Sequence, residues 1–358
     1  MHSLTRRGAI LSAGASLAAA CCTKPPVIEA PAHSEVIWAP GQPPLLFAVQ
    51  EIYPAAHQDR IHIAGGLLSD GTRVTGVSDR HIAYASGGVA NELAPLPARR
   101  HHPYAVSHKG KLYLLGGFGS DPDHITWVMS TDTLVFSTSG DTEANGKSYP
   151  GSWLPLAPAP EPHAEVVAAA IGDHIHIVGG RRPKGDANAA YGDHEDVDRH
   201  LVFDPAANAW SKAAPALSAR NSAAGALISG LWHVVGGRSV ANGPTDAHEV
   251  YAPQEDRWRN AAPMPKGSGA GGNAAAVLRD TLYVFGGEYF TGGQGGVHAE
   301  VWAYDPKTDA WTEVGKMPTP RHGLGAVTLN RSIWLVGGAK RPSGSETSNA
   351  VERFQLGG

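Results

Sequence analysis

Arginine, histidine, glutamate and asparagine recur in this sequence near six short apolar runs that each end in Gly-Gly. Guanidinium groups bind carboxylates and phosphates, and His or Glu side chains transfer protons, so such a set suits an acidic or hydroxyl-rich ligand. The candidate ligand-binding residues are Arg100, His101, His102, Arg181, Arg220, Asn221, Arg238, Asn273, Glu288 and Arg321. The candidate proton carriers are Glu165, His163 and His322.

The apolar runs that these residues flank form a repeat. The steps between the second glycines are 51, 63, 57, 50 and 51 residues. A period near fifty residues, with short strands in each unit, indicates a radial or stacked array, and this overrides the helical propensity of alanine-rich stretches. The second glycines are Gly66, Gly117, Gly180, Gly237, Gly287 and Gly338.

A third strand in each regular unit ends in an aromatic residue, and a tryptophan seven residues later opens a fourth strand. The clearest pairs are Phe203 with Trp210, Tyr251 with Trp258, and Tyr304 with Trp311. This pattern resembles the kelch repeat. The resemblance implies an all-β, six-bladed kelch-type β-propeller with four antiparallel strands per blade. The first unit departs from the pattern because Ala90 takes the tryptophan position, and the second carries an insertion at 140–149.

The two ends of the chain complement each other. The sixth unit stops after Phe354 and lacks a fourth strand, whereas Trp38 and Pro43 have the spacing of a regular fourth strand. We therefore expect an N-terminal strand at 35–39 to complete the last blade and to close the ring.

One face of this propeller collects the candidate residues. In an antiparallel blade the first strand starts where the second one ends, so both groups lie at one mouth of a central channel. Rotational symmetry then directs Arg100, Arg220 and Arg321 toward one axis and predicts an acidic ligand whose carboxylate bridges at least two of them. The alternative is that each arginine bonds loop carbonyls between blades and is part of the repeat pattern.

The N-terminal segment has the features of an export signal. Arg6-Arg7 precedes a short apolar run, as in twin-arginine signals, and Ala18–Ala20 offers small residues for cleavage. Cys21 is an alternative site for lipid attachment. We expect residues 1–22 to be the signal, 23–34 a linker and 35–358 the propeller, in a periplasmic or secreted protein with or without a lipid anchor.

Composition excludes several classes of function. Cys21 and Cys22 are the only cysteines, so the propeller has no disulfide framework, and the scattered Lys and Arg with a net charge of −4 argue against a nucleic-acid surface. No later segment is long and apolar enough to cross a membrane. The acidic stretch 193–200 is interpreted as a solvated loop rather than a metal site. We expect a monomer with no cofactor and no metal.

Two functions remain open. The first is an exported module that binds carbohydrate, another acidic small molecule or a protein on the Gly-Gly face. The second is a cofactor-free sugar mutarotase or epimerase, because the size and export signal resemble those of periplasmic sialic acid mutarotases. A carboxylate and an imidazole within hydrogen-bond reach at the channel mouth would favour the enzyme.

Overall fold

The computed structural model describes residues 35–119, 126–291 and 293–357, which belong to one compact unit spanning residues 34–358. The expected export signal and linker at 1–34 lie outside the described residues. Within the described part, no helix is long and apolar enough to span a membrane. Helical structure there is limited to two 3₁₀ turns, η1 (Tyr191–Asp193) and η2 (Pro342–Gly344).

Most of the described strands form six antiparallel sheets of four strands each, which we call blades 1 to 6. Blade 1 contains β3 (Ala55–His57), β4 (Arg60–Ala64), β7 (His81–Ala85) and β8 (Ala90–Leu93); blade 2 contains β10 (Tyr104–His108), β11 (Lys111–Leu115), β14 (Thr133–Ala144) and β15 (Lys147–Pro155); blade 3 contains β16 (Val167–Ile171), β17 (His174–Val178), β20 (His200–Asp204) and β21 (Ala209–Lys212). Blade 4 contains β22 (Ala224–Ile228), β23 (Leu231–Val235), β26 (His248–Ala252) and β27 (Arg257–Asn260); blade 5 contains β28 (Ala274–Leu278), β29 (Thr281–Phe285), β32 (Glu300–Asp305) and β33 (Ala310–Lys316); blade 6 contains β34 (Gly325–Leu329), β35 (Ser332–Val336), β36 (Val351–Leu356) and β1 (Val36–Ala39).

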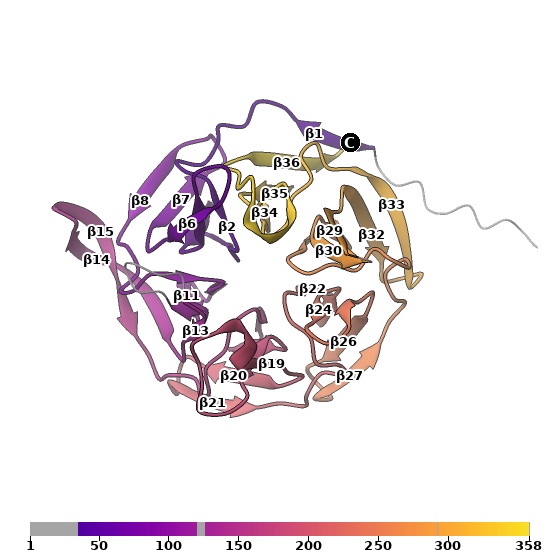
Figure 1. The fold of residues 1–358 in the computed structure, drawn as a ribbon, viewed down its shortest axis with the longest axis horizontal. Helices are drawn as coiled ribbons and strands as arrows, with labels where there is room; N and C mark the ends of the chain where they lie inside the picture. Colours follow the sequence, from indigo (N-terminus) through magenta and orange to yellow (C-terminus); the bar gives the residue numbers. More distant parts are fainter. Residues whose placement is uncertain (1–34, 120–125, 292, 358) are drawn as a thin grey trace, which may run out of the picture. The chain divides into compact units, whose positions relative to one another are not determined.

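The innermost strands of the blades form a closed circle. Each contacts the innermost strand of the next blade, from β3 through β10, β16, β22, β28 and β34, and β34 contacts β3 again. The blades of this unit accordingly surround a common axis (Figure 1). The expected β-propeller architecture is confirmed.

The N-terminal strand closes the last blade, as expected. β1 pairs antiparallel with β36, so that Trp38 lies opposite Phe354. The Trp38 ring packs edge-on against Phe354 at 5.4 Å and against Phe285 of blade 5 at 6.4 Å. Because β1 and β36 come from opposite ends of the chain, their pairing joins the first and last blades.

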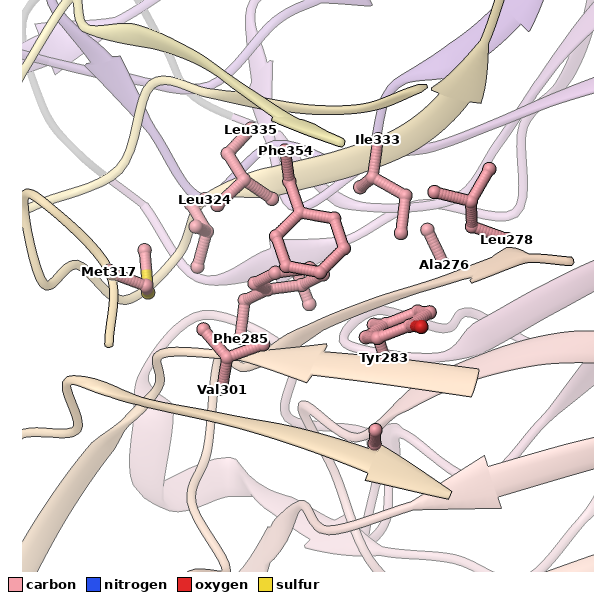
Figure 2. Close-up of a cluster of buried hydrophobic side chains, with 12 residues drawn as sticks. Ala276, Leu278, Tyr283, Phe285, Val301, Met317, Leu324, Ile333, Leu335 and Phe354 are labelled. Carbon is pink, nitrogen blue, oxygen red and sulfur yellow. The ribbon is translucent and has the colours of Figure 1, made fainter. Parts of the chain in front are cut away.

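Apolar side chains fill the spaces between neighbouring blades. Figure 2 shows the cluster between blades 5 and 6, in which Phe285, Leu335 and Phe354 are fully buried. The tryptophans of the fourth strands also link neighbouring blades. Each indole N–H donates to a backbone carbonyl in the segment that follows the preceding blade, as Trp258 does to Ala214. The same bond is made by Trp153, Trp210 and Trp311.

Short strands form a second layer where the Gly-Gly pairs end the second strands. Gly286 has a positive φ of 59°, and a Cβ there would collide with the carbonyl oxygen of Arg321 in blade 6, so this close approach requires glycine. The short strands are β2 (Val49–Gln50), β5 (Leu67–Ser69), β6 (Val74–Val77), β9 (Arg100–His101), β12 (Phe118–Gly119), β13 (Val128–Met129), β18 (Arg181–Pro183), β19 (His194–Asp196), β24 (Arg238–Ser239), β25 (Gly243–Pro244), β30 (Glu288–Thr291) and β31 (Gln294–Val297).

Candidate functional site

Six residues, one leading into each blade, form a ring around the axis at the Gly-Gly face. Each lies fifteen positions before the second glycine of its repeat and has a positive φ between 50° and 65°. Five of them donate a backbone hydrogen bond of 2.8–3.1 Å to the carbonyl oxygen of the member in the preceding blade. We call these residues the axial ring: Glu51, His102, Glu165, Ser222, Gly272 and Gly323.

The axial ring holds large side chains in a backbone conformation that favours glycine. Gly272 and Gly323 adopt it without strain, whereas Glu51, His102 and Glu165 have φ values of 54°, 55° and 56°. A non-glycine residue in this region costs about 1 kcal/mol or more, and such residues cluster at functional sites. Glycine would be less strained at Glu51, His102 and Glu165. The presence of large polar side chains at these positions therefore indicates that the side chains have a function.

Acidic and basic side chains alternate in a closed circuit around the same axis, with one residue from each blade. Glu51 Oε2 lies 3.0 Å from His102 Nε2, His102 Nε2 lies 3.8 Å from Glu165 Oε1, and Glu165 Oε1 lies 3.5 Å from Arg238 Nη2. Arg238 Nη1 donates to Glu288 Oε1. Glu288 Oε2 lies 3.7 Å from His322 Nε2, and His322 Nδ1 lies 3.5 Å from Glu51 Oε1. We call these six residues the charge circuit.

Small residues in the second half of the axial ring make room for this circuit. In blades 4 to 6 the ring position is serine or glycine. The charged side chains of the circuit come there from Arg238, Glu288 and His322 instead. A Cβ on Gly323 would lie 2.6 Å from Glu51 Oε1, and a Cβ on Gly271 would lie 2.7 Å from Arg238 Cδ. Small residues in the second half of the axial ring and at the adjacent Gly271 are therefore needed for the circuit to close.

The protonation states of the circuit follow from its contacts. Burial by itself would raise the pKa of Glu51, but His102 and His322 hold that pKa well below its usual value. Burial lowers the pKa of His322, but Glu51 and Glu288 raise it above the ordinary value overall. Both shifts favour the ionised pair.

His101 extends the contacts of His102 away from the circuit. Burial lowers the pKa of His101 to about 3, so this side chain is neutral, and its Nε2 donates to the carbonyl oxygen of Thr126 at 3.1 Å. His101 Nδ1 must then accept the 2.7 Å bond from His102 Nδ1. His102 Nε2 lies 3.0 Å from Glu51 Oε2, so the two ring nitrogens of His102 link His101 to Glu51.

Polar atoms without a partner surround the circuit. Buried atoms with no hydrogen-bond partner among the described residues include Glu165 Oε2, Arg181 Nε and Nη1, the Tyr53 hydroxyl and both amide atoms of Asn273. Arg181 Nε lies 3.9 Å from Glu165 Oε2, beyond hydrogen-bond distance. Tyr53 and Asn273 line an axial cavity of about 30 Å³, which has room for about one water molecule. Native proteins leave few such atoms unpaired, so these donors and acceptors indicate a place for an added polar group.

Comparison with known proteins agrees with this architecture. The family model described as the Kelch motif matches residues 270–318. The chain is 26% identical to Kelch-like protein terF of Aspergillus terreus over 86% of this chain, and 27% identical to human Kelch-like protein 23 over 70% of it. The chain thus carries a Kelch motif at 270–318 and is similar to kelch-like proteins over most of its length. It spans 64% and 39% of the length of those two kelch proteins.

A solved structure titled "Structure of YjhT" shares the fold. It superposes with a TM-score of 0.71 over 88% of this chain and 97% of that one, at 18% sequence identity. At this identity the likeness concerns the fold of the kelch propeller alone.

The three arginines that rotational symmetry suggested would converge do not share a partner. Arg100 pairs with Asp132 at 2.6 Å, Arg220 with Glu249 at 2.5 Å and Arg321 with Glu352 at 2.7 Å. Each also donates to a backbone carbonyl of its own blade. The expectation that one anion bridges these arginines is therefore wrong, because each blade supplies its own carboxylate. The alternative is also incorrect in one respect, since the bonds lie within a blade rather than between blades.

The other candidate residues divide into two groups. Arg238, Glu288, His102, Glu165 and His322 meet in the charge circuit, and Arg181 and His101 contact its members. Asn221 joins the edge of this group, because it accepts from Arg238 Nε at 3.3 Å and donates to Asp196 at 2.6 Å.

His163 lies apart from the charge circuit. It bonds the carbonyl oxygen of Glu161 at 3.3 Å and packs near Trp210. Burial and the nearby Arg199 lower its pKa to about 3. The structure thus gives this histidine a packing environment and does not bring it to Glu165.

Sequence reasoning missed Glu51, Ser222, Tyr53 and Asp196. Glu51 and Ser222 lie at the same fifteen-residue offset as His102 and Glu165, so the repeat itself contained the signal. Asp196 lies in the stretch interpreted as a solvated loop, yet its side chain is largely buried and accepts hydrogen bonds from Asn221 and from the backbone of Val240. Among the described residues, no group of His, Cys, Asp or Glu is arranged to hold a metal ion.

Proposed function

We propose that the chain is a binding propeller whose Gly-Gly mouth takes an acidic, hydroxyl-rich small molecule of the sugar-acid class. The proposal is supported by one observation above all, the charge circuit bordered by buried donors and acceptors that have no partner. Arg238 and Glu51 are 22% and 12% exposed, so solvent reaches the circuit. Kelch propellers typically bind proteins or ligands, which agrees with a binding role.

The chemistry of the unpaired atoms suits this ligand class. A sugar hydroxyl both donates and accepts, so it can satisfy Glu165 Oε2, whereas the Asn273 amide and the Tyr53 hydroxyl line a cavity that has room for about one water molecule. Arg181 Nη1 and Arg238 provide charged donors for a carboxylate. Arg181 is the better candidate of the two because two of its nitrogens, Nε and Nη1, have no hydrogen-bond partner among the described residues, whereas Arg238 already bonds Glu288.

An apolar rim borders the polar centre of this face. Val128 and Phe290 belong to the short strands β13 and β30, and Val240 lies in the turn after β24; they are 41%, 50% and 56% exposed, respectively. Exposed apolar groups around a polar centre suit the apolar side of a sugar ring or the surface of a protein partner. A protein carrying an acidic glycan would use both features.

Calorimetric titration with a panel of sugar acids and the matching neutral sugars tests the binding proposal. Arg181→Gln should weaken binding of an acid about tenfold or more, because a charge-assisted hydrogen bond contributes about 1.5–3 kcal/mol. Arg182→Gln is the matched control, since Arg182 is the adjacent arginine, 44% exposed and paired with Glu195. Equal losses in both variants, or no preference for acids over neutral sugars, would contradict the proposal.

A second candidate function is acid–base chemistry on a sugar ring, the cofactor-free mutarotase or epimerase. The 3.0 Å contact between Glu51 and His102, extended by the 2.7 Å contact from His102 to His101, favours it. Glu51→Gln should then slow anomer interconversion, followed by NMR, while the affinity for the sugar persists. Unchanged interconversion in this variant would leave binding as the function.

Export is part of the proposal and rests on the sequence of the N-terminal segment. Replacement of Arg6 and Arg7 by lysine should retain the protein in the cytoplasm if the twin-arginine route is used. Cell fractionation measures this outcome, and unchanged export would refute that route. Cys21→Ala tests lipid attachment in the same assay, because loss of a lipid anchor moves the protein from the membrane to the soluble fraction.

A further inference from the structure

A second cavity lies between blades 1 and 2, at the end of β4 away from its Gly-Gly pair. Its volume is about 210 Å³, and its walls include Arg60, Asn91, Leu93, Phe136 and Thr138. It shares no residue with the axial ring or the charge circuit. Any ligand here would therefore bind independently of the mouth.

The charge of this cavity is unbalanced. Arg60 is the only Lys or Arg among the lining residues, and none of them is Asp or Glu. Arg60 Nη1 is buried and has no hydrogen-bond partner among the described residues. A buried guanidinium nitrogen without a partner is costly, so an added anion would be stabilised here.

Two of the equivalent interfaces between blades contain a carboxylate that the cavity between blades 1 and 2 lacks. In blades 4 and 5 the residue equivalent to Phe136 is Tyr251 or Tyr304, whose hydroxyl donates to Asp256 or Asp309. In blade 3 the residue equivalent to these aspartates is Asn208, whose side chain accepts from the Ala157 N–H as Asp256 and Asp309 accept from the N–H groups of Ala214 and Ala262. In blade 2 the long β14–β15 hairpin replaces the turn that carries this residue.

The inserted hairpin also encloses the cavity. β15 contacts β8 of blade 1, and the Ala94 N–H donates to the carbonyl oxygen of Pro150 at 3.0 Å. Pro150 and Gly151 thereby form one wall, beside the Phe136 ring. The insertion thus replaces the turn that carries Asp256 in blade 4 and Asp309 in blade 5, and it also covers the cavity.

Size and wall chemistry define the ligand. A cavity of roughly 150 Å³ holds benzene, so about 210 Å³ accommodates one six-membered ring with a small charged substituent. Phe136 and Leu93 provide apolar contacts for the ring, and Arg60 provides the partner for the charge. We propose that this cavity binds a monocyclic aromatic carboxylate, with the carboxylate on Arg60 and the ring against Phe136 and Leu93.

Calorimetric titration of the purified chain with benzoate and with neutral benzyl alcohol tests this proposal. A ligand of this size should bind with a dissociation constant of about 1 mM, and the neutral analogue about tenfold more weakly. Arg60→Gln should remove the preference for the carboxylate. Lys111→Gln is the matched control, because Lys111 opens the second strand of blade 2 as Arg60 opens that of blade 1.

A blocking variant locates the site without altering Arg60. Asn91 is an exposed residue of β8 that lines the cavity, so Asn91→Phe should fill it and abolish binding of both ligands. The proposal is overturned if benzoate gives no saturable signal up to about 10 mM, an order of magnitude above the expected constant. It is also overturned if Arg60→Gln binds benzoate as the parent does, or if Asn91→Phe leaves binding unchanged. Should Arg60→Gln fail to fold, the blocking variant still decides.

Discussion

At the scale of single residues, the axial ring allows the effect of backbone strain on stability to be measured separately from the effect of ion pairing. Glu51 and Ser222 share the same positive φ, but they differ in what their side chains bond. Glu51 pairs with His102 and His322, whereas Ser222 makes one hydrogen bond of 3.0 Å to Glu165. Replacing each by glycine relieves the same strain and removes very different partners.

We expect Glu51→Gly to lower the free energy of unfolding by about 2 kcal/mol. Loss of a buried ion-pair partner costs about 3 kcal/mol or more, and relief of the backbone strain returns about 1 kcal/mol. Ser222→Gly should lie within about 1 kcal/mol of the parent, because strain relief offsets one lost hydrogen bond. Urea unfolding at pH 6.5 compares the two, and equal effects would mean that the charge of Glu51 contributes nothing.

Residue roles were only partly predictable from the sequence. Arg100, Arg220 and Arg321 have equivalent places in the repeat, but their partners Asp132, Glu249 and Glu352 lie 32, 29 and 31 residues further along the chain. That second regularity was present in the sequence and identifies braces within each blade. The charge circuit could not be predicted in the same way, because its members come from three different positions of the repeat.

At the scale of elements, buried histidine pairs distinguish blades 1, 3 and 4 from the others. The Nδ1 of the second-strand histidine lies 2.8–2.9 Å from the Nε2 of the third-strand histidine in each pair. The other three blades have tyrosine or tryptophan with threonine or valine at these positions, as Tyr283 and Val301 in blade 5. The second-strand histidines are thus packing residues. The pairs are His62 with His81, His176 with His200, and His233 with His248.

These pairs should make the protein less stable in acid. Burial lowers the pKa of His233 to about 3 and that of His248 to about 4, below the unfolded value near 6.5. Their contribution to stability is therefore full above pH 6.5 and is lost as the pH falls toward the folded pKa, by about 1.4 kcal/mol per pH unit for each histidine that stays neutral. Replacing His233 by Tyr and His248 by Val copies the pair of blade 5 and should flatten the decline. Urea midpoints between pH 7 and pH 5 measure it, and parallel curves would contradict the assignment.

The strand that closes blade 6 allows a second test at this scale. Trp38 is partly buried against Phe285 and Phe354, while its neighbour Ile37 is 42% exposed. Trp38→Ala should cost about 3 kcal/mol, at the lower end for a buried aromatic residue, and Ile37→Ala less than about 1 kcal/mol. Urea denaturation of both variants measures these changes in the free energy of unfolding. A similar small loss of stability in both variants would mean that β1 contributes little to the stability of blade 6.

The strand plan was predictable because its signals are local and repeated. Paired glycines, strand-ending aromatic residues and the tryptophan that follows them recur in register, and Trp38 with Pro43 revealed the exchange of end strands. The short-strand layer was not foreseen. Its strands follow the Gly-Gly pairs in loops of unequal length, and pairing over two to four residues leaves little pattern in a sequence.

At the scale of the whole described unit, the ring is closed in three separate ways. β1 pairs with β36, the innermost strands contact one another in a full circle, and the charge circuit links all six blades in the same order. The circuit contains three carboxylates, one arginine and two histidines. It is electrically neutral only when His102 and His322 are both protonated, so its contribution must depend on pH.

We therefore expect stability to decline on the alkaline side of neutrality as well as in acid. The pKa of His322 is raised in the folded state by Glu51 and Glu288, against the opposing effect of burial. A raised pKa contributes stability that is fully present below the unfolded value of about 6.5 and is lost as the pH rises through the folded value. Glu51→Gln removes the partner of both histidines, so it should lower stability at pH 6 and flatten the decline between pH 6.5 and pH 9. Asp132→Asn is the matched control, because Asp132 pairs with Arg100, which does not titrate in this range, and it should shift the curve without changing its slope. Urea midpoints for the three proteins distinguish these outcomes, and a parent curve that is level from pH 6.5 to pH 9 would show that the circuit does not depend on imidazolium.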